Sequence, residues 1–499
     1  MKVKLEPKFT LHSSLSFAGA LLLMKKNYIA GNWTEGVDYI NNINPSDLSD
    51  VIGQFAQADI NQTNMAIDSA SAALKDWSDS PLQFRSDILD KVGNNILSRS
   101  QELGMLLARE EGKTAAEGIG EVIRAGHIFK FFGAEVLRQK GDFFNSTRPG
   151  IDVSVSRSAV GVVGLILPWN FPISIPAWKI APALAFGNSV VFKPAQLVPA
   201  LAHALTEIIV EAGIPPGVFN LVMGKGADVG DTITNNHKVN AISFTGSVST
   251  GRKVAQSAVS RMAKVQLEMG GKNPLIVLDD ADLDRATDCA IQGAFYSTGQ
   301  RCTASSRLIV TDGIYSKFIK QMKEKMTNLR TDHALKKETD IGPVVDQRQL
   351  EQDLSYIAIG KSEGAVLFCG GERVARETEG NFLTPALFID THNNMRINQE
   401  EIFGPIASVI KVKNYDEALN IANDTEFGLS AGIVTNSLKH ASHFKRHSQS
   451  GIAQVNLPTA GVDYHVPFGG TKSSSYGARE QGQYAKEFYT TVKTSYTAS

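Results

Sequence analysis

Cysteine is scarce in this chain of 499 residues. The only three, Cys289, Cys302 and Cys369, are far apart in sequence, and none belongs to a CxxC pair. An odd number of widely spaced cysteines argues against a disulfide framework and against a zinc site. We therefore expect a protein of the reducing cytoplasm with no bound metal.

An excess of either charge is also missing, since Lys and Arg number 50 and Asp and Glu number 51. This balance gives no reason to expect a nucleic acid or an anionic membrane as partner. Tandem repeats and low-complexity linkers are absent as well. A hydrophobic content of 42% is typical of a globular protein, and the length predicts two or three closely packed domains.

Residues 1–23 hold three lysines and then a short apolar run, as a secretion signal does. The run is too short to span a membrane, and no small-residue cleavage site follows it. The sequence from Met24 onward, MKKNYIAGNW, is typical of a folded protein. We expect residues 1–23 to be a non-native extension and Met24 to be the true start; a secretion signal is the alternative.

Hydrophobic periodicity predicts an α/β fold. Residues 60–140 carry apolar residues at helical spacing, whereas short β-branched runs at 188–194, 217–224 and 240–247 alternate with helical stretches such as 199–213. This alternation indicates a parallel sheet covered on both faces, as in a dinucleotide-binding domain, across residues 150–270.

A second α/β domain is predicted from about 270 to 450. It starts with a strand and a helix over 273–295, for which Asp280 or Asp282 is the expected N-cap. Further strands are expected at 306–312, 407–412, 429–436 and 451–457. The tail 487–498 alternates like a strand without a neighbour in sequence, so it must pair with a distant strand or another subunit.

The stretch STGQRCTASSR (297–307) places Cys302 among small polar residues. A reacting thiol and a small buried side chain are both consistent with it. In PWNFP (168–172), Asn170 follows an apolar strand and could donate its amide to an oxyanion, or simply close a turn.

Lys193 leaves the end of a buried strand, where it could contact an adenosine ribose. Gln196 follows it, and a neutral side chain there would not repel the 2′-phosphate of NADP. The glycine loops at 224–230 and 244–254 could meet a pyrophosphate, although neither is a complete dinucleotide fingerprint and each could be a tight helix start.

Glu268 precedes Gly270-Gly271 and could swing as a general base, or be a turn glutamate on the surface. In EEIFGP (400–405), Glu401 and Phe403 could contact a nicotinamide ribose, or form an ordinary turn.

Seven motifs stand in one order along the chain: PWNFP, FKPA, FTGS, LEMGGKNP, GQRC, EEIFGP and PFGG. From about Tyr28 to Thr494 the chain therefore resembles the NAD(P)-dependent aldehyde dehydrogenase superfamily. The resemblance implies a Rossmann-type cofactor domain (24–140 and 160–270), an α/β catalytic domain (271–482) and a small bridging β-sheet for oligomerisation (141–159 and 483–499). It also implies a homodimer or homotetramer.

The resemblance assigns a role to each matched residue. Cys302 would be the nucleophile, Asn170 an oxyanion donor and Glu268 the base that activates water, with Lys179 and Glu480 as a proton relay. NADP or NAD would be held by Trp169, Lys193, Gln196, Gly226, Gly246, Ser247, Gly251, Glu401 and Phe403.

The segment TKSSSYGARE (471–480) departs from the Lys-x-Ser-Gly-x-Gly-Arg-Glu series of most relatives. With the stretch 456–470 it is similar to the branch that oxidises 2-oxoglutaric semialdehyde (2,5-dioxopentanoate). Succinic semialdehyde or a broad range of aldehydes is the alternative, but the arginines of the succinic branch would fall near Trp178 and Tyr296, which are not basic.

The candidate substrate-contacting residues are Gln300, Arg301, Gln454 and Thr459. Arg301 has three possible roles, namely lowering the pKa of the thiol, binding a substrate carboxylate, or forming a structural ion pair. Two further hypotheses remain: a non-enzymatic protein on this scaffold, and a thiol hydrolase that needs no cofactor.

Overall fold

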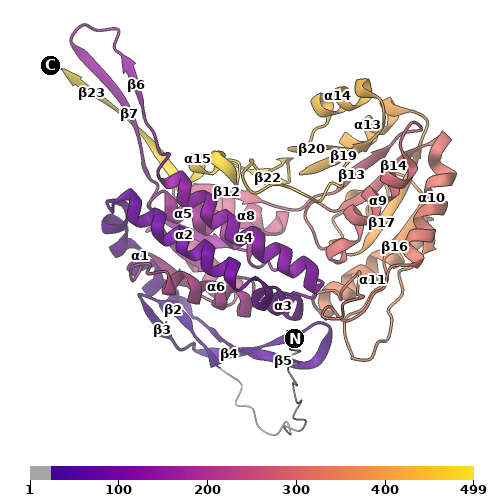
Figure 1. The fold of residues 1–499 in the computed structure, drawn as a ribbon, viewed down its shortest axis with the longest axis horizontal. Helices are drawn as coiled ribbons and strands as arrows, with labels where there is room; N and C mark the ends of the chain where they lie inside the picture. The colour runs from indigo at the N-terminus through magenta and orange to yellow at the C-terminus, as the bar shows by residue number, and fades with distance from the viewer. Residues whose placement is uncertain (1–23, 499) are drawn as a thin grey trace, which may run out of the picture.

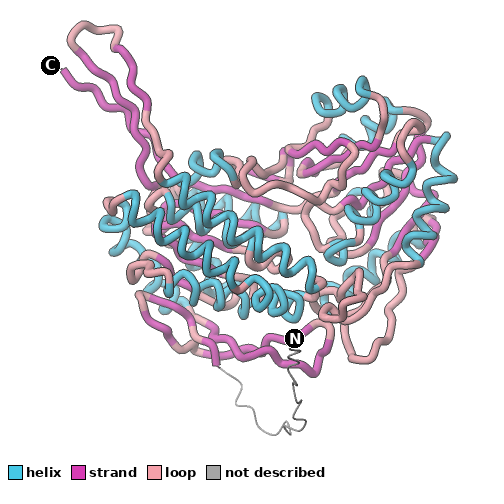
Figure 2. Tube along the Cα trace, in the orientation of Figure 1, coloured by secondary structure: helices cyan, strands magenta, loops and turns pink. Residues whose placement is uncertain are grey.

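The computed structural model describes residues 24–498 and shows two α/β bodies with a β-arm projecting from one of them (Figures 1 and 2). The α/β class is therefore confirmed. Our expectation for residues 1–23 lies outside the described residues. None of the helices within 24–498 combines the length and the hydropathy that a bilayer crossing requires.

The first body contains an eight-stranded sheet in the order β22-β12-β11-β8-β9-β10-β2-β3. The five strands from β12 to β10 are parallel, and β22 and β2 pair antiparallel with them on either side. Strand β3 pairs antiparallel with β2 and forms the edge. The strands are β2 (Asn27–Ile29), β3 (Asn32–Thr34), β8 (Val162–Ile166), β9 (Ser189–Lys193), β10 (Phe219–Leu221), β11 (Val239–Thr245), β12 (Lys264–Glu268) and β22 (Ser475–Tyr476). The segment expected to be catalytic, 271–482, thus contributes β22 to this sheet.

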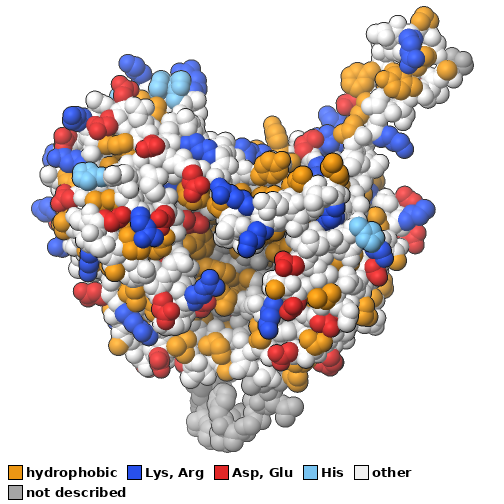
Figure 3. Space-filling view, turned by 180° about the vertical axis from the view of Figure 1, so that it is seen from behind, with side chains coloured by type: hydrophobic (Ala, Val, Ile, Leu, Met, Phe, Trp, Pro, Cys, Tyr) orange, Lys and Arg blue, Asp and Glu red, His pale blue; other side chains and the backbone are white. Residues whose placement is uncertain are grey.

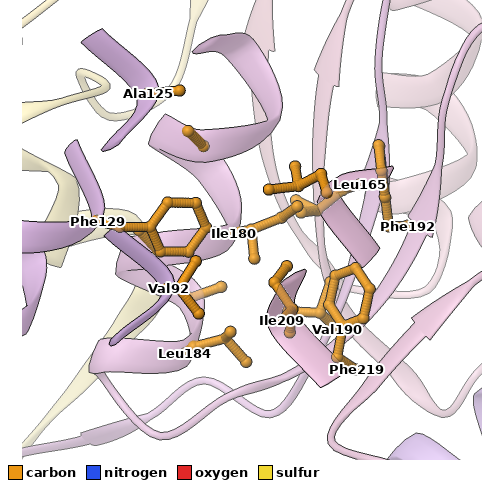
Figure 4. Packing of buried hydrophobic residues seen from close by; sticks show 14 of the residues in the cluster. Val92, Ala125, Phe129, Leu165, Ile180, Leu184, Val190, Phe192, Ile209 and Phe219 are labelled. Carbon is orange, nitrogen blue, oxygen red and sulfur yellow. The ribbon is translucent and has the colours of Figure 1, made fainter. Parts of the chain in front are cut away.

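Helices cover both faces of this sheet. The larger core packs Phe192 and Phe219 of the sheet against helical side chains such as Phe129 and Ile180 (Figure 4). A second core, which includes Ile67, fills the opposite face. The helices are α1 (Ile60–Ser78), α2 (Leu82–Ser98), α3 (Ser100–Glu111), α4 (Ala115–Val136), α5 (Ser174–Ala185), α6 (Pro199–Glu211), α7 (Asp231–Asn235) and α8 (Val248–Ser260).

The second body contains a seven-stranded sheet in the order β15-β16-β17-β14-β13-β19-β20. Its strands are β13 (Asn273–Val277), β14 (Ser305–Thr311), β15 (Val366–Cys369), β16 (Ala386–Thr391), β17 (Ile406–Val412), β19 (Ser430–Val434) and β20 (Ile452–Val455). Its helices are α9 (Leu283–Ala294), α10 (Asp312–Thr327), α11 (Gln347–Ser362), α12 (Arg396–Gln399), α13 (Tyr415–Asn423) and α14 (Leu438–His447). Of the two residues expected to cap α9, Asp282 is the N-cap, and its side chain accepts a 2.8 Å hydrogen bond from the Arg285 N–H.

The arm consists of β6 (Asp142–Asn145), β7 (Ile151–Ala159) and β23 (Thr490–Ala498), and it extends well away from the body (Figure 1). Strand β23 follows the short helix α15 (Lys486–Tyr489) and runs antiparallel to β7 along its whole length. The predicted tail strand thus finds its partner within its own chain, because α15 turns the chain back toward the base of the arm.

Two small sheets complete the fold, β1 (Met24–Lys25) with β5 (Asp47–Gln57) and β4 (Asp38–Asn44), and β18 (Phe427–Gly428) with β21 (Thr471–Lys472). The parallel strands position the functional residues, since Lys193 ends β9, Glu268 ends β12 and PWNFP follows β8. In open α/β sheets, ligands bind beyond these carboxyl ends.

Candidate active site

Cys302 lies in a tightly coiled loop between the 3₁₀ turn Tyr296–Gly299 and β14. Ser297 and Thr298 have φ angles of 52° and 56°, which is uncommon for non-glycine residues and costs about 1–3 kcal/mol each. Gly299 continues the turn at φ 66°, where a Cβ would come within 2.2 Å of the Gly404 carbonyl oxygen. The Asn273 side-chain amide fixes the loop at Cys302 by donating to the Cys302 backbone carbonyl at 2.8 Å.

A cavity of about 290 Å³ opens beside the Cys302 side chain, between α4, α5 and the loop 460–468. Figure 3 shows that the molecular surface is hollowed between the two bodies. The lining combines aromatic and charged side chains, and it comprises Lys113, Glu117, Gly120, Glu121, Arg124, Phe171, Ser174, Trp178, Ser297, Arg301, Cys302, Thr303, Ala460, Gly461, Val462 and Phe468.

Asn170 is buried next to the Cys302 loop. Its side-chain amide donates to the Gln300 carbonyl oxygen at 3.0 Å, and its own carbonyl accepts from Lys113 Nζ at 2.7 Å. One amide hydrogen of Asn170 is therefore already committed to the loop that carries the thiol, and the second is available to a ligand.

Glu268 is buried and accepts a 2.6 Å hydrogen bond from the Ser475 hydroxyl. Burial, and then the negative charge of Glu480, raise the pKa of the Glu268 carboxyl well above its usual range. Lys179 donates to Ser243 Oγ at 2.6 Å and forms an ion pair with Glu480. The structure thus brings Glu268, Lys179 and Glu480 into one buried charged group.

Burial also raises the pKa of the Cys302 thiol to about 12, with further increases from Glu268 and Glu401. The thiol therefore keeps its proton at neutral pH, and a proton acceptor is needed before the sulfur can attack.

The groups that act most strongly on the pKa of this thiol do not include Arg301. Its guanidinium donates to Glu117 Oε1 at 3.0 Å and to Ser297 Oγ at 2.8 Å. Of the three roles expected for Arg301, the structure therefore contains the ion pair, which fastens the Cys302 loop to α4.

The other candidate substrate residues support loops and do not line the cavity. The Gln300 side chain accepts from the Val345 N–H at 3.0 Å, and Gln454 donates to the Gly461 carbonyl at 2.9 Å. Thr459 donates to the Thr303 carbonyl at 2.7 Å. These bonds tie one polar atom of each residue to the backbone around the cavity, and a substrate contact by the three residues stays a prediction.

A second set of predicted residues lies at the carboxyl ends of the first sheet and opposite it. Lys193 is buried, its one hydrogen bond among the described residues goes to the Pro194 carbonyl at 3.2 Å, and burial lowers its pKa to about 8. Glu401 accepts from the Gly271 N–H at 2.9 Å, and burial raises its pKa to about 7. The rings of Trp169 and Phe403 meet edge to face at 5.4 Å.

The N-terminus of α8 adds backbone donors to this region. Ser247 caps the helix, a Cβ on Gly246 would come within 2.6 Å of the Phe244 ring, and one on Gly251 within 2.5 Å of Met269 Sδ. Gly226, by contrast, faces open space. Gln196 donates to Gln57 at 2.8 Å.

These residues fit a dinucleotide. A buried amine without an acidic partner and the free N–H groups of a helix N-terminus suit phosphates and a ribose. The partly buried carboxylate of Glu401 suits ribose hydroxyls. The side chains of Gln57 and Gln196 are neutral, so neither would repel a 2′-phosphate.

Four charged residues of the cavity went unpredicted, namely Lys113, Glu117, Glu121 and Arg124. The last three recur at spacings of four and three residues, which puts them on one face of α4. That spacing was a usable signal, but charges at helical spacing usually face solvent.

Comparisons with known proteins agree with this geometry. The model of the aldehyde dehydrogenase family matches residues 33–495. An alpha-ketoglutaric semialdehyde dehydrogenase of Bacillus subtilis is 42% identical, covering 94% of this chain and 97% of its own. A 2,5-dioxopentanoate dehydrogenase of Saccharolobus solfataricus is 40% identical, covering 94% and 98%.

Solved structures also match nearly the whole chain, at lower sequence identity. A betaine aldehyde dehydrogenase of Staphylococcus aureus in complex with NAD⁺ has a TM-score of 0.93 at 30% identity, covering 96% of this chain and 95% of its own. An NADP-dependent enzyme of Escherichia coli has a TM-score of 0.92 at 34% identity, covering 95% and 98%. The predicted fold and family resemblance are confirmed, and because sequence and structure match over nearly the whole described chain, this protein belongs to the aldehyde dehydrogenase family.

Proposed function

We propose that this enzyme oxidises 2-oxoglutaric semialdehyde to 2-oxoglutarate with NAD or NADP. The observation that carries the chemistry is that Cys302 faces a cavity, with Asn170 bonded to its loop and the charge of Glu268 acting on its thiol. The substrate rests on three relatives at 40% identity or more, whose names specify this aldehyde.

Cys302 attacks the aldehyde carbon after its thiol proton passes to water in the cavity, which gives a thiohemiacetal. The Asn170 amide and the Cys302 N–H stabilise the oxyanion, and losing one such donor typically costs about 10²–10³ in turnover. When bound, the oxidised dinucleotide supplies the two-electron acceptor. The carbon–hydrogen bond of the thiohemiacetal breaks, the hydrogen leaves with both electrons as hydride, and the carbon becomes the carbonyl carbon of a thioester on Cys302.

Glu268 takes a proton from the water that attacks this thioester, a contribution of about 10²–10⁴. The carbon–sulfur bond breaks, Cys302 departs as a thiolate and the carboxylic acid is released. Glu480 and Lys179 lie in the same buried charged group and carry the proton from Glu268 onward.

Lys193, Glu401, Trp169 and Phe403 hold the dinucleotide, together with the backbone around Gly226, Gly246, Ser247 and Gly251. Gln196 is neutral, so both NAD and NADP are accepted.

A panel of aldehydes tests the substrate. We expect kcat/KM for 2-oxoglutaric semialdehyde to exceed that for succinic semialdehyde, betaine aldehyde and simple aliphatic aldehydes by at least about tenfold, a ratio within reach of one differing group. A higher kcat/KM for any of these three would overturn the assignment.

We also propose a homodimer or homotetramer in the cytoplasm. Phe143, Phe144, Val492 and Tyr496 on the arm are each more than half exposed, and Figure 3 shows hydrophobic side chains on it. The free thiols of Cys289, Cys302 and Cys369 suit a reducing compartment. Light scattering of the purified protein tests the assembly, and a monomeric mass would contradict it.

A further inference from the structure

Five charged side chains line the cavity beside Cys302, and four of them form two ion pairs. Lys113 Nζ lies 2.8 Å from Glu121, and Arg301 lies 3.0 Å from Glu117. These two pairs cancel, so the fifth group, Arg124, leaves the cavity wall with one excess positive charge.

Arg124 has no ion pair with any residue in 24–498. Its one hydrogen bond there, 3.4 Å long, goes to Gln481, and its Nε is buried without a partner. The negative charges acting on it come from Glu121 and Asp463. Glu121 is already committed, since it pairs with Lys113 and accepts from the backbone N–H groups of Ile173 and Ser174.

The position of Arg124 is fixed by aromatic packing. Its guanidinium lies 5.9 Å from the centre of the Trp178 ring, which itself packs against Phe468 at 5.4 Å. Trp178 is fastened by a 2.7 Å hydrogen bond from its indole N–H to Glu480. Arg124 is partly buried, with its Nε fully covered. Removing even part of a guanidinium from water without an anion is costly, so a ligand anion would offset that cost.

Neither of the other two cations is equally available. The Lys113 ammonium is bound by Glu121 and by the Asn170 carbonyl. The Arg301 Nε is also buried without a partner among the described residues, but the charge of Arg301 is paired with Glu117, and the same guanidinium donates to Ser297. A guanidinium is also the group whose planar donors best match a carboxylate.

We propose that Arg124 binds the carboxylate of the substrate and so selects a 2-oxo-acid aldehyde over a neutral one. The proposal rests on the proposed function for the identity of the substrate. The aldehyde of such a molecule reaches Cys302 while its charged end meets Arg124 across the same cavity.

The test compares Arg124→Gln with Lys130→Gln, a matched loss of one positive charge on the same helix. Lys130 forms an exposed ion pair with Asp90 and does not line the cavity. Each enzyme is assayed with 2-oxoglutaric semialdehyde and with pentanal, a neutral aldehyde that also has five carbons.

For Arg124→Gln we expect kcat/KM for the oxo-acid to fall about 10- to 100-fold, mainly through KM, because hydrogen bonds to a charged group are lost. We expect kcat/KM for pentanal to change less than about threefold, and Lys130→Gln to match the wild type with both substrates. Arg124→Lys, which keeps the charge but not the planar fork, should recover part of the loss.

Equal losses on both substrates would show that Arg124 only supports the fold, and no loss on the oxo-acid would show that another group binds the carboxylate. Either result overturns the inference while leaving the proposed function in place. A wild-type enzyme that prefers pentanal overturns the proposed function, and the inference with it.

Discussion

The two sides of Cys302 differ in how their buried charges are satisfied. On the side of Glu268, the acid is held by Ser475, and Lys179 pairs with Glu480. On the dinucleotide side, Lys193 is buried and Glu401 partly buried, and the side chains of both have backbone partners only, among the described residues. The first side is therefore organised before any ligand arrives, whereas the second holds charges that a ligand must satisfy. Substitutions on the two sides should accordingly affect different steps.

The largest expected effect is that of Cys302→Ala, which removes the proposed nucleophile between the two sides. Aldehyde oxidation should fall at least about 10⁴-fold, while quenching of protein fluorescence by the reduced dinucleotide should be retained. Cys289→Ala is the control, because that thiol is buried in α9. Substantial oxidation by Cys302→Ala would mean that another group is the nucleophile.

Glu268→Gln should separate the two halves of the reaction on the organised side. Glutamine keeps the shape of the side chain but cannot take a proton from water, so steady turnover should fall about 10²–10⁴-fold. Rapid mixing should still show a burst of about one reduced nucleotide per subunit. If the burst is absent, Glu268 acts before the thioester forms.

Lys193→Met should break the other side. The KM for the dinucleotide should rise about 10- to 100-fold, because charge-assisted hydrogen bonds to the ribose are lost, while the KM for the aldehyde stays constant. Lys238→Met, which removes an exposed lysine paired with Asp68, is the matched control. An unchanged dinucleotide KM would contradict the role given to Lys193.

Ser475→Ala should have the smallest effect, on pH dependence. In the wild type, kcat should rise with pH beyond the ordinary carboxyl range, because the pKa values of Glu268 and Cys302 are both raised and each group must lose its proton. The Ser475 hydroxyl stabilises the charged form of Glu268 and so lowers its pKa. Its removal should move the rising limb to higher pH, and a limb that moves down or stays would contradict this account.

The sequence predicted the residues that end strands. Lys193 and Glu268 stand where β-branched runs meet proline or glycine, so their position at one edge of a parallel sheet followed from local pattern and sheet geometry. The roles of Cys302 and Asn170 came from the family resemblance and not from their spacing.

What could not be predicted depends on contacts between distant segments. The pairing of Arg301 with Glu117 joins residues 184 positions apart, so its role stayed open among three possibilities. Arg124 was missed for a similar reason, because only the packing of α4 against Trp178 and Gln481 covers part of its side chain. The pairing of β23 with β7 of the same chain likewise depends on the turn at α15.

Cys302 is proposed to carry the oxidised substrate as a thioester, which is then hydrolysed with Glu268 as the base. Mass spectrometry of Glu268→Gln, quenched in acid after mixing with 2-oxoglutaric semialdehyde and NADP or NAD, tests it most directly. We expect a 2-oxoglutaryl group on the peptide that contains Cys302, and none on the peptides that contain Cys289 and Cys369. An unmodified Cys302 at the end of the burst, or an acyl group on another cysteine, would contradict it.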